Sequence, residues 1–124
     1  MSTPESKSQA LQNRLVSFAS QIVYVASSLP KTQEGSHISK QILRSGTAAA
    51  ANYGEARGAE SRSDFIHKLR IVLKELNETA IWLQLIVESS LISREKLGTS
   101  ITENQELCRI ITASIKTAGG FNRD

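Results

Sequence analysis

Apolar residues recur at spacings of three and four along four successive segments of this chain, a period typical of amphipathic helices. The first segment carries the stripe Leu11, Leu15, Phe18, Ile22, Val25 and Leu29. None of the four segments shows the strict alternation of a half-buried strand. Because short polar connections make consecutive helices antiparallel neighbours, the pattern predicts an all-α fold, an antiparallel up-down-up-down four-helix bundle.

Capping residues and helix breakers indicate where these helices begin and end. A hydroxyl that can accept free backbone N–H groups stands at Thr3, Ser63 and Ser93, and the pair Gly119-Gly120 is a C-terminal stop signal. A chain of 124 residues fits one core, so we interpret residues 1–124 as a single domain. We expect its helices over about residues 4–29, 37–58, 63–90 and 94–118, with a short tail over 119–124.

The second predicted helix is unusually rich in small residues. Gly46, Ala50, Gly54 and Gly58 lie four apart and form one row, which lets a neighbouring backbone come close. Each glycine lowers intrinsic helix stability by up to about 1 kcal/mol, so close packing has to offset that cost. The alternative is a helix that breaks near Gly54 to Gly58.

The third predicted helix carries more apolar surface than one core face needs. Its main stripe is Phe65, Leu69, Val72, Leu76, Ala80 and Leu83, and it is widened by Ile66, Leu73, Ile81, Trp82, Leu85, Ile86 and Val87. Excess apolar surface on so short a chain favours an interface between copies. We therefore expect Trp82→Asp or Leu83→Asp to lower the mass of an oligomer.

Basic residues are concentrated in the middle of the chain. The formal net charge is only +3, but residues 31–74 hold eight basic and four acidic residues. Such a segment can contact the phosphates of RNA or DNA, although an ordinary solvated face with ion pairs is the alternative. The candidate nucleic-acid-binding residues are Lys40, Arg44, Arg57, Arg62, Lys68, Arg70 and Lys74.

The single cysteine and the absence of long apolar runs bear on the compartment. Cys108 cannot form an internal disulfide, and it stands in an apolar stripe, where we expect a small core residue and not a reactive thiolate. No segment approaches the roughly 20 apolar residues that cross a bilayer. The first residues lack the basic and apolar regions of a signal peptide. We expect a cytoplasmic protein with no membrane partner.

The polar residues of the two central segments do not match a catalytic or metal site. Glu75 and Glu78 are spaced i, i+3, as in di-metal bundles, but neither His37 nor His67 completes a Glu-x-x-His motif. No nucleophile and base pair up with an anion-binding loop. We therefore expect no enzyme activity, no metal or other cofactor and no small-molecule substrate.

Asn52 and Glu55 fall beside the row of small residues, where we expect them to be partly buried. Arg44 lies about 16 Å from Glu55 along the helix, so a contact to Glu55 has to come from another helix or subunit. Our hypothesis is that such polar groups fix helix register and subunit geometry, and an active site is the alternative. The residues assigned to this structural network or interface are Asn52, Glu55, Glu75, Glu78 and Trp82.

Four short blocks resemble a known protein family. They are Arg44-Ser45-Gly46-Thr47, Ala51-Asn52-Tyr53-Gly54-Glu55-Ala56, Ser63-Asp64-Phe65, and Leu73-Lys74-Glu75-Leu76-Asn77-Glu78-Thr79 with Trp82-Leu83. Their order and separation are similar to those of bacterial four-helix-bundle proteins encoded in intervening sequences of 23S ribosomal RNA genes, which are also labelled ribosomal-protein-like. The resemblance extends from about Leu15 to Ile115 and implies a bundle that assembles as a ring, a homopentamer.

The resemblance also bears on function. The chain is more distantly similar to accessory proteins of diversity-generating retroelements, which implies a basic surface that faces nucleic acid. We expect a non-enzymatic homo-oligomer that binds structured RNA or DNA without strong sequence specificity. The alternative is a protein-protein interaction scaffold with no nucleic-acid role. Clustering of the basic side chains on one exposed face would favour binding, whereas their pairing with acidic neighbours would favour the scaffold.

Overall fold

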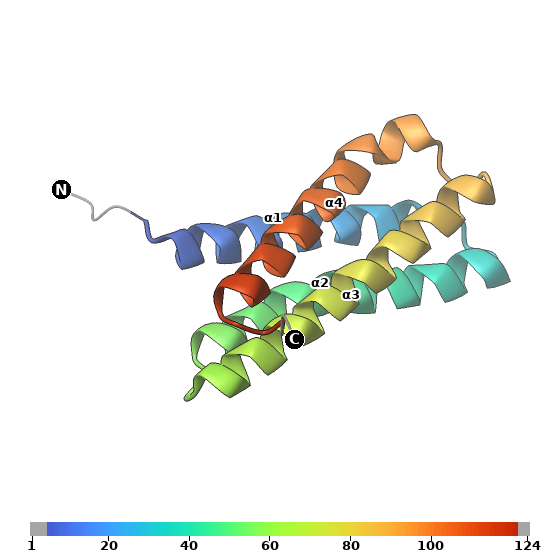
Figure 1. Cartoon of the computed structure of the whole chain (residues 1–124). Helices are drawn as coiled ribbons and strands as arrows, with labels where there is room; N and C mark the ends of the chain where they lie inside the picture. Colours follow the sequence, from blue (N-terminus) through green and yellow to red (C-terminus); the bar gives the residue numbers. More distant parts are fainter. Residues whose placement is uncertain (1–4, 122–124) are drawn as a thin grey trace.

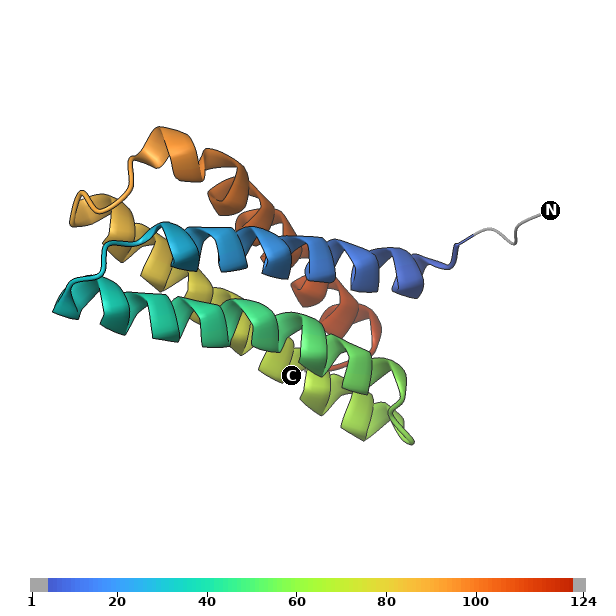
Figure 2. The ribbon, with the colours of Figure 1, turned by 180° about the vertical axis from the view of Figure 1, so that it is seen from behind.

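The computed structural model describes residues 5–121, which form four α-helices joined by short connections (Figure 1). Each helix packs against the next one in sequence, and Figure 2 shows the first two lying side by side in front of the third. The prediction of an all-α fold is confirmed, and the sequential contacts agree with an up-down four-helix bundle. The helices are α1 (Lys7–Ser28), α2 (Gln33–Arg57), α3 (Arg62–Glu88) and α4 (Arg94–Thr117).

One hydrophobic cluster lies between the four helices and receives side chains from all of them. Contact between α1 and α4 is the least extensive of the neighbouring pairs, because α4 crosses α1 at an angle (Figure 1). Among the described residues, no helix is long and apolar enough to cross a membrane. The largest fully buried side chains are Phe18, Leu15, Ile22, Ile42, Leu69, Leu76, Leu83, Ile86, Leu107, Ile111, Ile115 and Val72.

A hydroxyl side chain caps the N-terminus of every helix and fixes where it begins. Ser6 accepts from the backbone N–H of Gln9, and Ser61 accepts from that of Asp64. The predicted starts at residues 4 and 63 are therefore wrong: Glu5 and Ser6 lie outside α1, and Ser61 caps α3 in place of Ser63. Thr3 lies outside the described residues. The cap predicted at Ser93 is confirmed by its bond to the Lys96 N–H.

Helix α2 begins four residues before the predicted start at residue 37. Thr32 caps it by accepting from the Gly35 N–H at 3.1 Å. This early start requires glycine at position 35, because a Cβ there would overlap the carbonyl oxygen of Pro30. Close approach of the connecting chain thus extends the helix into residues that the polar composition had indicated as loop.

The row of small residues in α2 lies partly against α1. A Cβ on Gly46 would overlap the side chain of Ile22, so the two backbones pack more closely than any larger residue would permit. Gly54 is also helical, and Gly58 is the C-cap of α2. The prediction of a continuous helix is confirmed, and the alternative of a break at Gly54 is wrong.

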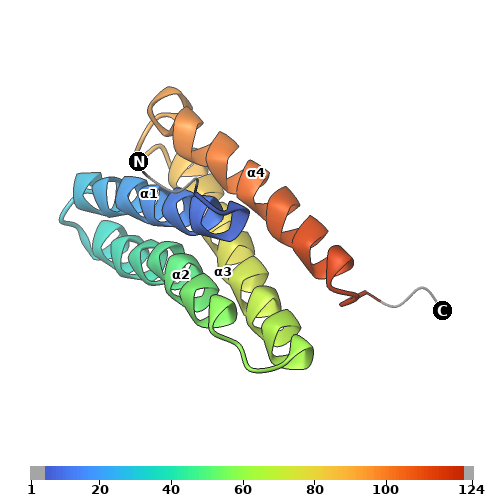
Figure 3. The same ribbon diagram turned by 90° about the vertical axis from the view of Figure 1, so that its left-hand side faces the viewer.

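The broad apolar surface of α3 is largely covered within the bundle itself. Helix α3 lies between α2 and α4 and packs against both (Figure 3), so it buries two sides. Leu83 is 2% exposed, and its predicted place at an interface between copies is wrong. Trp82 is partly buried against the same core. The apolar side chains that remain outward on α3 are Ile81, which is 60% exposed, and Leu85, which is 40% exposed.

Candidate functional site

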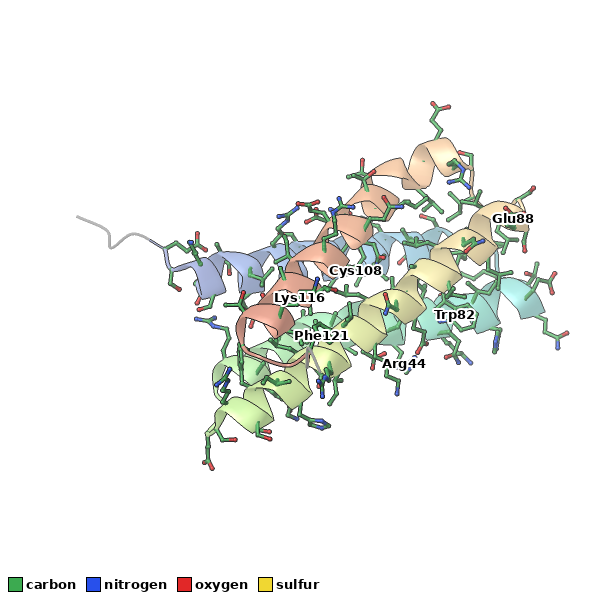
Figure 4. All side chains as sticks on the ribbon, viewed as in Figure 1. Arg44, Trp82, Glu88, Cys108, Lys116 and Phe121 are labelled. Carbon is green, nitrogen blue, oxygen red and sulfur yellow. The ribbon has the colours of Figure 1, made fainter. Side chains whose placement is uncertain are left out.

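Residues of the Arg44-Ser45 and Glu75-to-Trp82 blocks meet where α2 and α3 pack together. The Arg44 guanidinium lies 3.3 Å from Glu75 Oε1 and also forms an ion pair with Glu78 Oε2. The Trp82 indole N–H donates to the same Glu78 oxygen at 3.0 Å, and the His37 ring meets Trp82 edge-on. Figure 4 labels Arg44 on α2 and Trp82 on α3. The bonds from Trp82 and Arg44 lower the pKa of Glu78, which keeps this carboxylate charged.

Beneath these ion pairs lies a buried pair of hydroxyls. Ser45 Oγ and Thr79 Oγ1 are 2.8 Å apart, and both residues are fully buried. Thr79 also bonds to the carbonyl of Glu75, one turn earlier in α3. Losing the bond between the two hydroxyls would cost about 0.5–1.5 kcal/mol. The pair therefore fixes the register of α2 on α3.

The two layers together form a junction between α2 and α3. Arg44 is half exposed, so its ion pairs contribute only about 1 kcal/mol or less each. Five cavities formed by residues 5–121 are lined by residues other than Arg44, Glu75 and Glu78. Within residues 5–121, His, Cys, Asp and Glu form no group of three that could hold a metal ion.

The predictions for Asn52 and Glu55 are confirmed in part, since Asn52 is partly buried and the partner of Glu55 comes from another helix. The Asn52 side-chain amide donates to the Ala48 carbonyl within its own helix, so it makes no bond to another helix. The Glu55 side chain is 59% exposed, not partly buried, and forms an ion pair with Lys68 of α3 at 2.8 Å. Neither residue takes part in the ion pairs that Arg44 forms with Glu75 and Glu78.

Cys108 is half buried on α4, in keeping with the expected small core residue. Its thiol contacts the side-chain oxygen of Asn77 at 3.6 Å. Burial raises the pKa of this thiol, which disfavours the reactive thiolate.

Arg57 is the last residue of α2, Arg62 is the first residue of α3, and Arg70 lies about two turns further along α3. We call this end of the bundle the basic pole. Arg57 donates to the side-chain oxygen of Gln9 at 3.0 Å. Arg62 donates to the Ala118 carbonyl, and Arg70 donates to the Gly120 carbonyl. All three acceptors are neutral, and within residues 5–121 none of the three guanidiniums forms an ion pair. The basic pole comprises Arg57, Arg62 and Arg70.

The other predicted basic residues divide into paired and outlying ones. Arg44 and Lys68 are engaged in ion pairs with Glu75, Glu78 and Glu55. Lys40 and Lys74 are exposed and take part in none of the ion pairs formed by residues 5–121. The structure thus brings together only part of the predicted basic set.

Two hollows at the basic pole share Arg62. One, of about 490 Å³, lies between the end of α2 and the start of α3 and includes Arg57 and Tyr53. The other, of about 640 Å³, lies between the start of α3 and the end of α4 and includes His67 and Arg70. His67 was not among the predicted binding residues, although its position one turn before Arg70 could have indicated it.

The exposed face of α1 is a second feature that the sequence reasoning missed. Tyr24 is 74% exposed, and Val16 and Val23 also point away from the core. No charged residue occurs from Leu15 to Pro30, a signal that was visible in the sequence. Uncharged, partly apolar surface of this kind is typical of contact regions.

The fold and the α2–α3 junction define a four-helix-bundle protein with a polar cluster between its central helices. Residues 7–113 match the family model of the 23S rRNA-intervening sequence protein, and the chain belongs to this family. It is similar to a crystal structure of a protein of unknown function from the S23 ribosomal protein family of Bacteroides thetaiotaomicron. The TM-score is 0.83 at 40% identity, over 90% of this chain and 99% of the other. Comparison with curated proteins gives no significant match.

Proposed function

We propose that this protein is a non-enzymatic, self-associating bundle whose basic pole binds the phosphate backbone of structured RNA or DNA. The observation that carries the proposal is the position of Arg57, Arg62 and Arg70 at one end of the bundle, where each donates to a neutral acceptor and forms no ion pair within residues 5–121. Uncompensated guanidiniums attract phosphates whatever the base sequence. Of the seven predicted basic residues, these three carry the proposal, and Arg44 and Lys68 are assigned to the fold.

Self-association would multiply this charge. Apolar side chains are exposed on two different helices, Val16 and Val23 on α1 and Ile81 and Leu85 on α3. Contact between two different faces is heterologous, and a heterologous contact that closes makes a ring. A ring, such as a homopentamer, would repeat the basic pole around one axis and offer several phosphate contacts at once.

The apolar faces give a prediction about mass. Val23→Glu and Ile81→Glu each place a charge on an exposed apolar position, so each is expected to lower the oligomer mass in light scattering while the helical content is retained. Gln33→Glu, on an exposed polar position, serves as the control and is expected to keep the wild-type mass. If both apolar variants keep the wild-type mass, these faces are not the contacts between copies.

The proposed binding is tested by fluorescence anisotropy with a structured ribosomal RNA fragment and with duplex DNA. Changing Arg57, Arg62 and Arg70 together to Glu is expected to weaken binding at least a hundredfold, because three attractive contacts become repulsive. The matched control changes Lys31, Arg94 and Lys96 to Glu at the opposite end of the bundle. A control that loses as much affinity as the pole variant would assign the effect to net charge alone.

A second candidate function is a protein-protein scaffold without a nucleic-acid role. The ion pairs of Arg44 and Lys68 and the uncharged face of α1 favour it, because they direct charged groups inward and leave a contact surface outward. Absence of RNA and DNA binding by the wild-type protein at low salt would select this candidate over the first.

A further inference from the structure

The hollow between the start of α3 and the end of α4 has the composition of a phosphate site. Ser63, His67 and Arg70 share one face of α3, at spacings of four and three. Arg62 and the turn Gly119-Gly120 complete the wall. Within residues 5–121, the side chains that line this hollow include no acidic one. Lys68, one turn after Asp64 along α3, has a raised pKa because it bonds to Glu55, and the charges of Glu55 and Asp64 add to this effect.

The end of α4 brings the two arginines of this hollow closer together than α3 alone would. Arg62 and Arg70 are eight residues apart, which is about 12 Å along a helix. Their guanidiniums bond to the carbonyls of Ala118 and Gly120, which are only two residues apart in the closing turn. Each guanidinium has five N–H donors, so most of its donors remain available after this contact. The backbone thereby holds two charged donor groups in place before any ligand arrives.

Glycine is required at both positions of this turn. Gly119 has φ +85°, and a Cβ there would overlap the Arg62 guanidinium. A Cβ on Gly120 would overlap Ile115 and Ile66. The turn itself is fixed by the Gly120 N–H, which donates to the Ile115 carbonyl at 2.8 Å. The Gly119-Gly120 pair therefore does more than end α4, since it lets the chain close over Arg62 at the wall of the hollow.

We propose that this hollow binds a phosphate monoester, either free or at the 5′ end of a nucleic-acid strand. A monoester carries nearly two negative charges and three terminal oxygens, which suit two guanidiniums that act from one wall. A phosphate inside a strand has one charge and two free oxygens, so it suits the two guanidiniums less well than a monoester does. The strand-end form of this inference rests on the proposed nucleic-acid function, whereas the free form does not.

The direct test uses protein labelled with 15N at its seven glycines. Titration with adenosine 5′-monophosphate or inorganic phosphate is expected to shift the Gly119 and Gly120 amide signals in a saturable way, and adenosine is expected to leave them unchanged. Arg70→Gln is expected to abolish the shifts. Arg57→Gln, which removes the same charge from the neighbouring hollow, is expected to retain them. Gly98 lies near the start of α4. In each variant, a Gly98 amide signal at the wild-type position shows that the variant is folded.

A second arm compares short single-stranded DNA with a 5′-phosphate and with a 5′-hydroxyl. The phosphorylated strand is expected to bind at least about tenfold more tightly, and Arg70→Gln is expected to remove that difference. Absence of saturable glycine shifts, or their persistence in Arg70→Gln, would overturn the site. If the glycine shifts occur but the two strands bind equally, the hollow binds a free phosphate monoester and not the 5′ end of a strand. If structured RNA binds while no glycine shift occurs, the proposed function stands and this inference fails alone.

Discussion

Replacing Leu83 by aspartate is expected to prevent stable folding of the chain. Leu83 is 2% exposed and lies in the cluster shared by the four helices. Aspartate there would lose the apolar contacts and bury a carboxylate without a partner, which together cost about 4 kcal/mol or more. Because a typical domain is stable by only about 5–15 kcal/mol, the helical signal in circular dichroism should melt at much lower temperature or be lost.

The adjacent position supplies the matched control. Gln84 is exposed on the same helix, so Gln84→Asp introduces the same group in contact with water. Its free energy of unfolding is expected to stay within about 0.5 kcal/mol of the wild type. A Leu83→Asp protein that folds and melts like the Gln84→Asp protein would show that Leu83 is not in the core.

Replacing Gly46 by valine is expected to destabilise the protein by about 3–5 kcal/mol. A Cβ at position 46 would overlap Ile22, so α1 and α2 would have to move apart and lose the packing between them. Valine also has a lower helix propensity than alanine. Gly46→Ala is therefore expected to lower the free energy of unfolding less than Gly46→Val does. Chemical denaturation followed by circular dichroism measures both.

Gly98 offers the comparison for this prediction. It also lies inside a helix, α4, but a Cβ there would meet nothing within 4 Å. Gly98→Ala is expected to raise the free energy of unfolding by up to about 1 kcal/mol, because alanine is the better helix former. Equal effects of alanine at positions 46 and 98 would contradict the close approach of α1 and α2.

The periodicity of the apolar residues was sufficient to predict four helices, because each stripe is a property of its own segment. Helix ends were harder, since several hydroxyl residues compete as caps within a few positions. The sequence analysis favoured Thr3 and Ser63 as caps, whereas Ser6 and Ser61 are the N-caps of α1 and α3 in the structure. Leu83 and Ile81 could not be distinguished either, because which side of α3 is covered depends on where α2 and α4 lie.

The candidate site shows the same limit. Helix spacing excluded an ion pair between Arg44 and Glu55, but the actual partners, Glu75 and Glu78, come from the packing of α3. The positive charge of residues 31–74 was evident in the sequence. The sequence did not show which of these basic residues form ion pairs and which form the basic pole. Arg62 and Arg70 are positioned by the carbonyls of Ala118 and Gly120, which lie far away in the sequence.

The central claim is that Arg57, Arg62 and Arg70 contact phosphates, and the salt dependence of binding tests it most directly. The affinity for duplex DNA is measured at several salt concentrations for the wild type, for the variant with these three arginines changed to Gln, and for the variant with Lys31, Arg94 and Lys96 changed to Gln. Each lost phosphate contact lowers the slope of log affinity against log salt by about 0.9. In the variant of Arg57, Arg62 and Arg70, we expect this slope to decrease by about 2–3 for each copy of the protein that contacts the DNA. In the variant of Lys31, Arg94 and Lys96, we expect the slope to change little. An unchanged slope in the pole variant, or an equal decrease in both, would contradict the account.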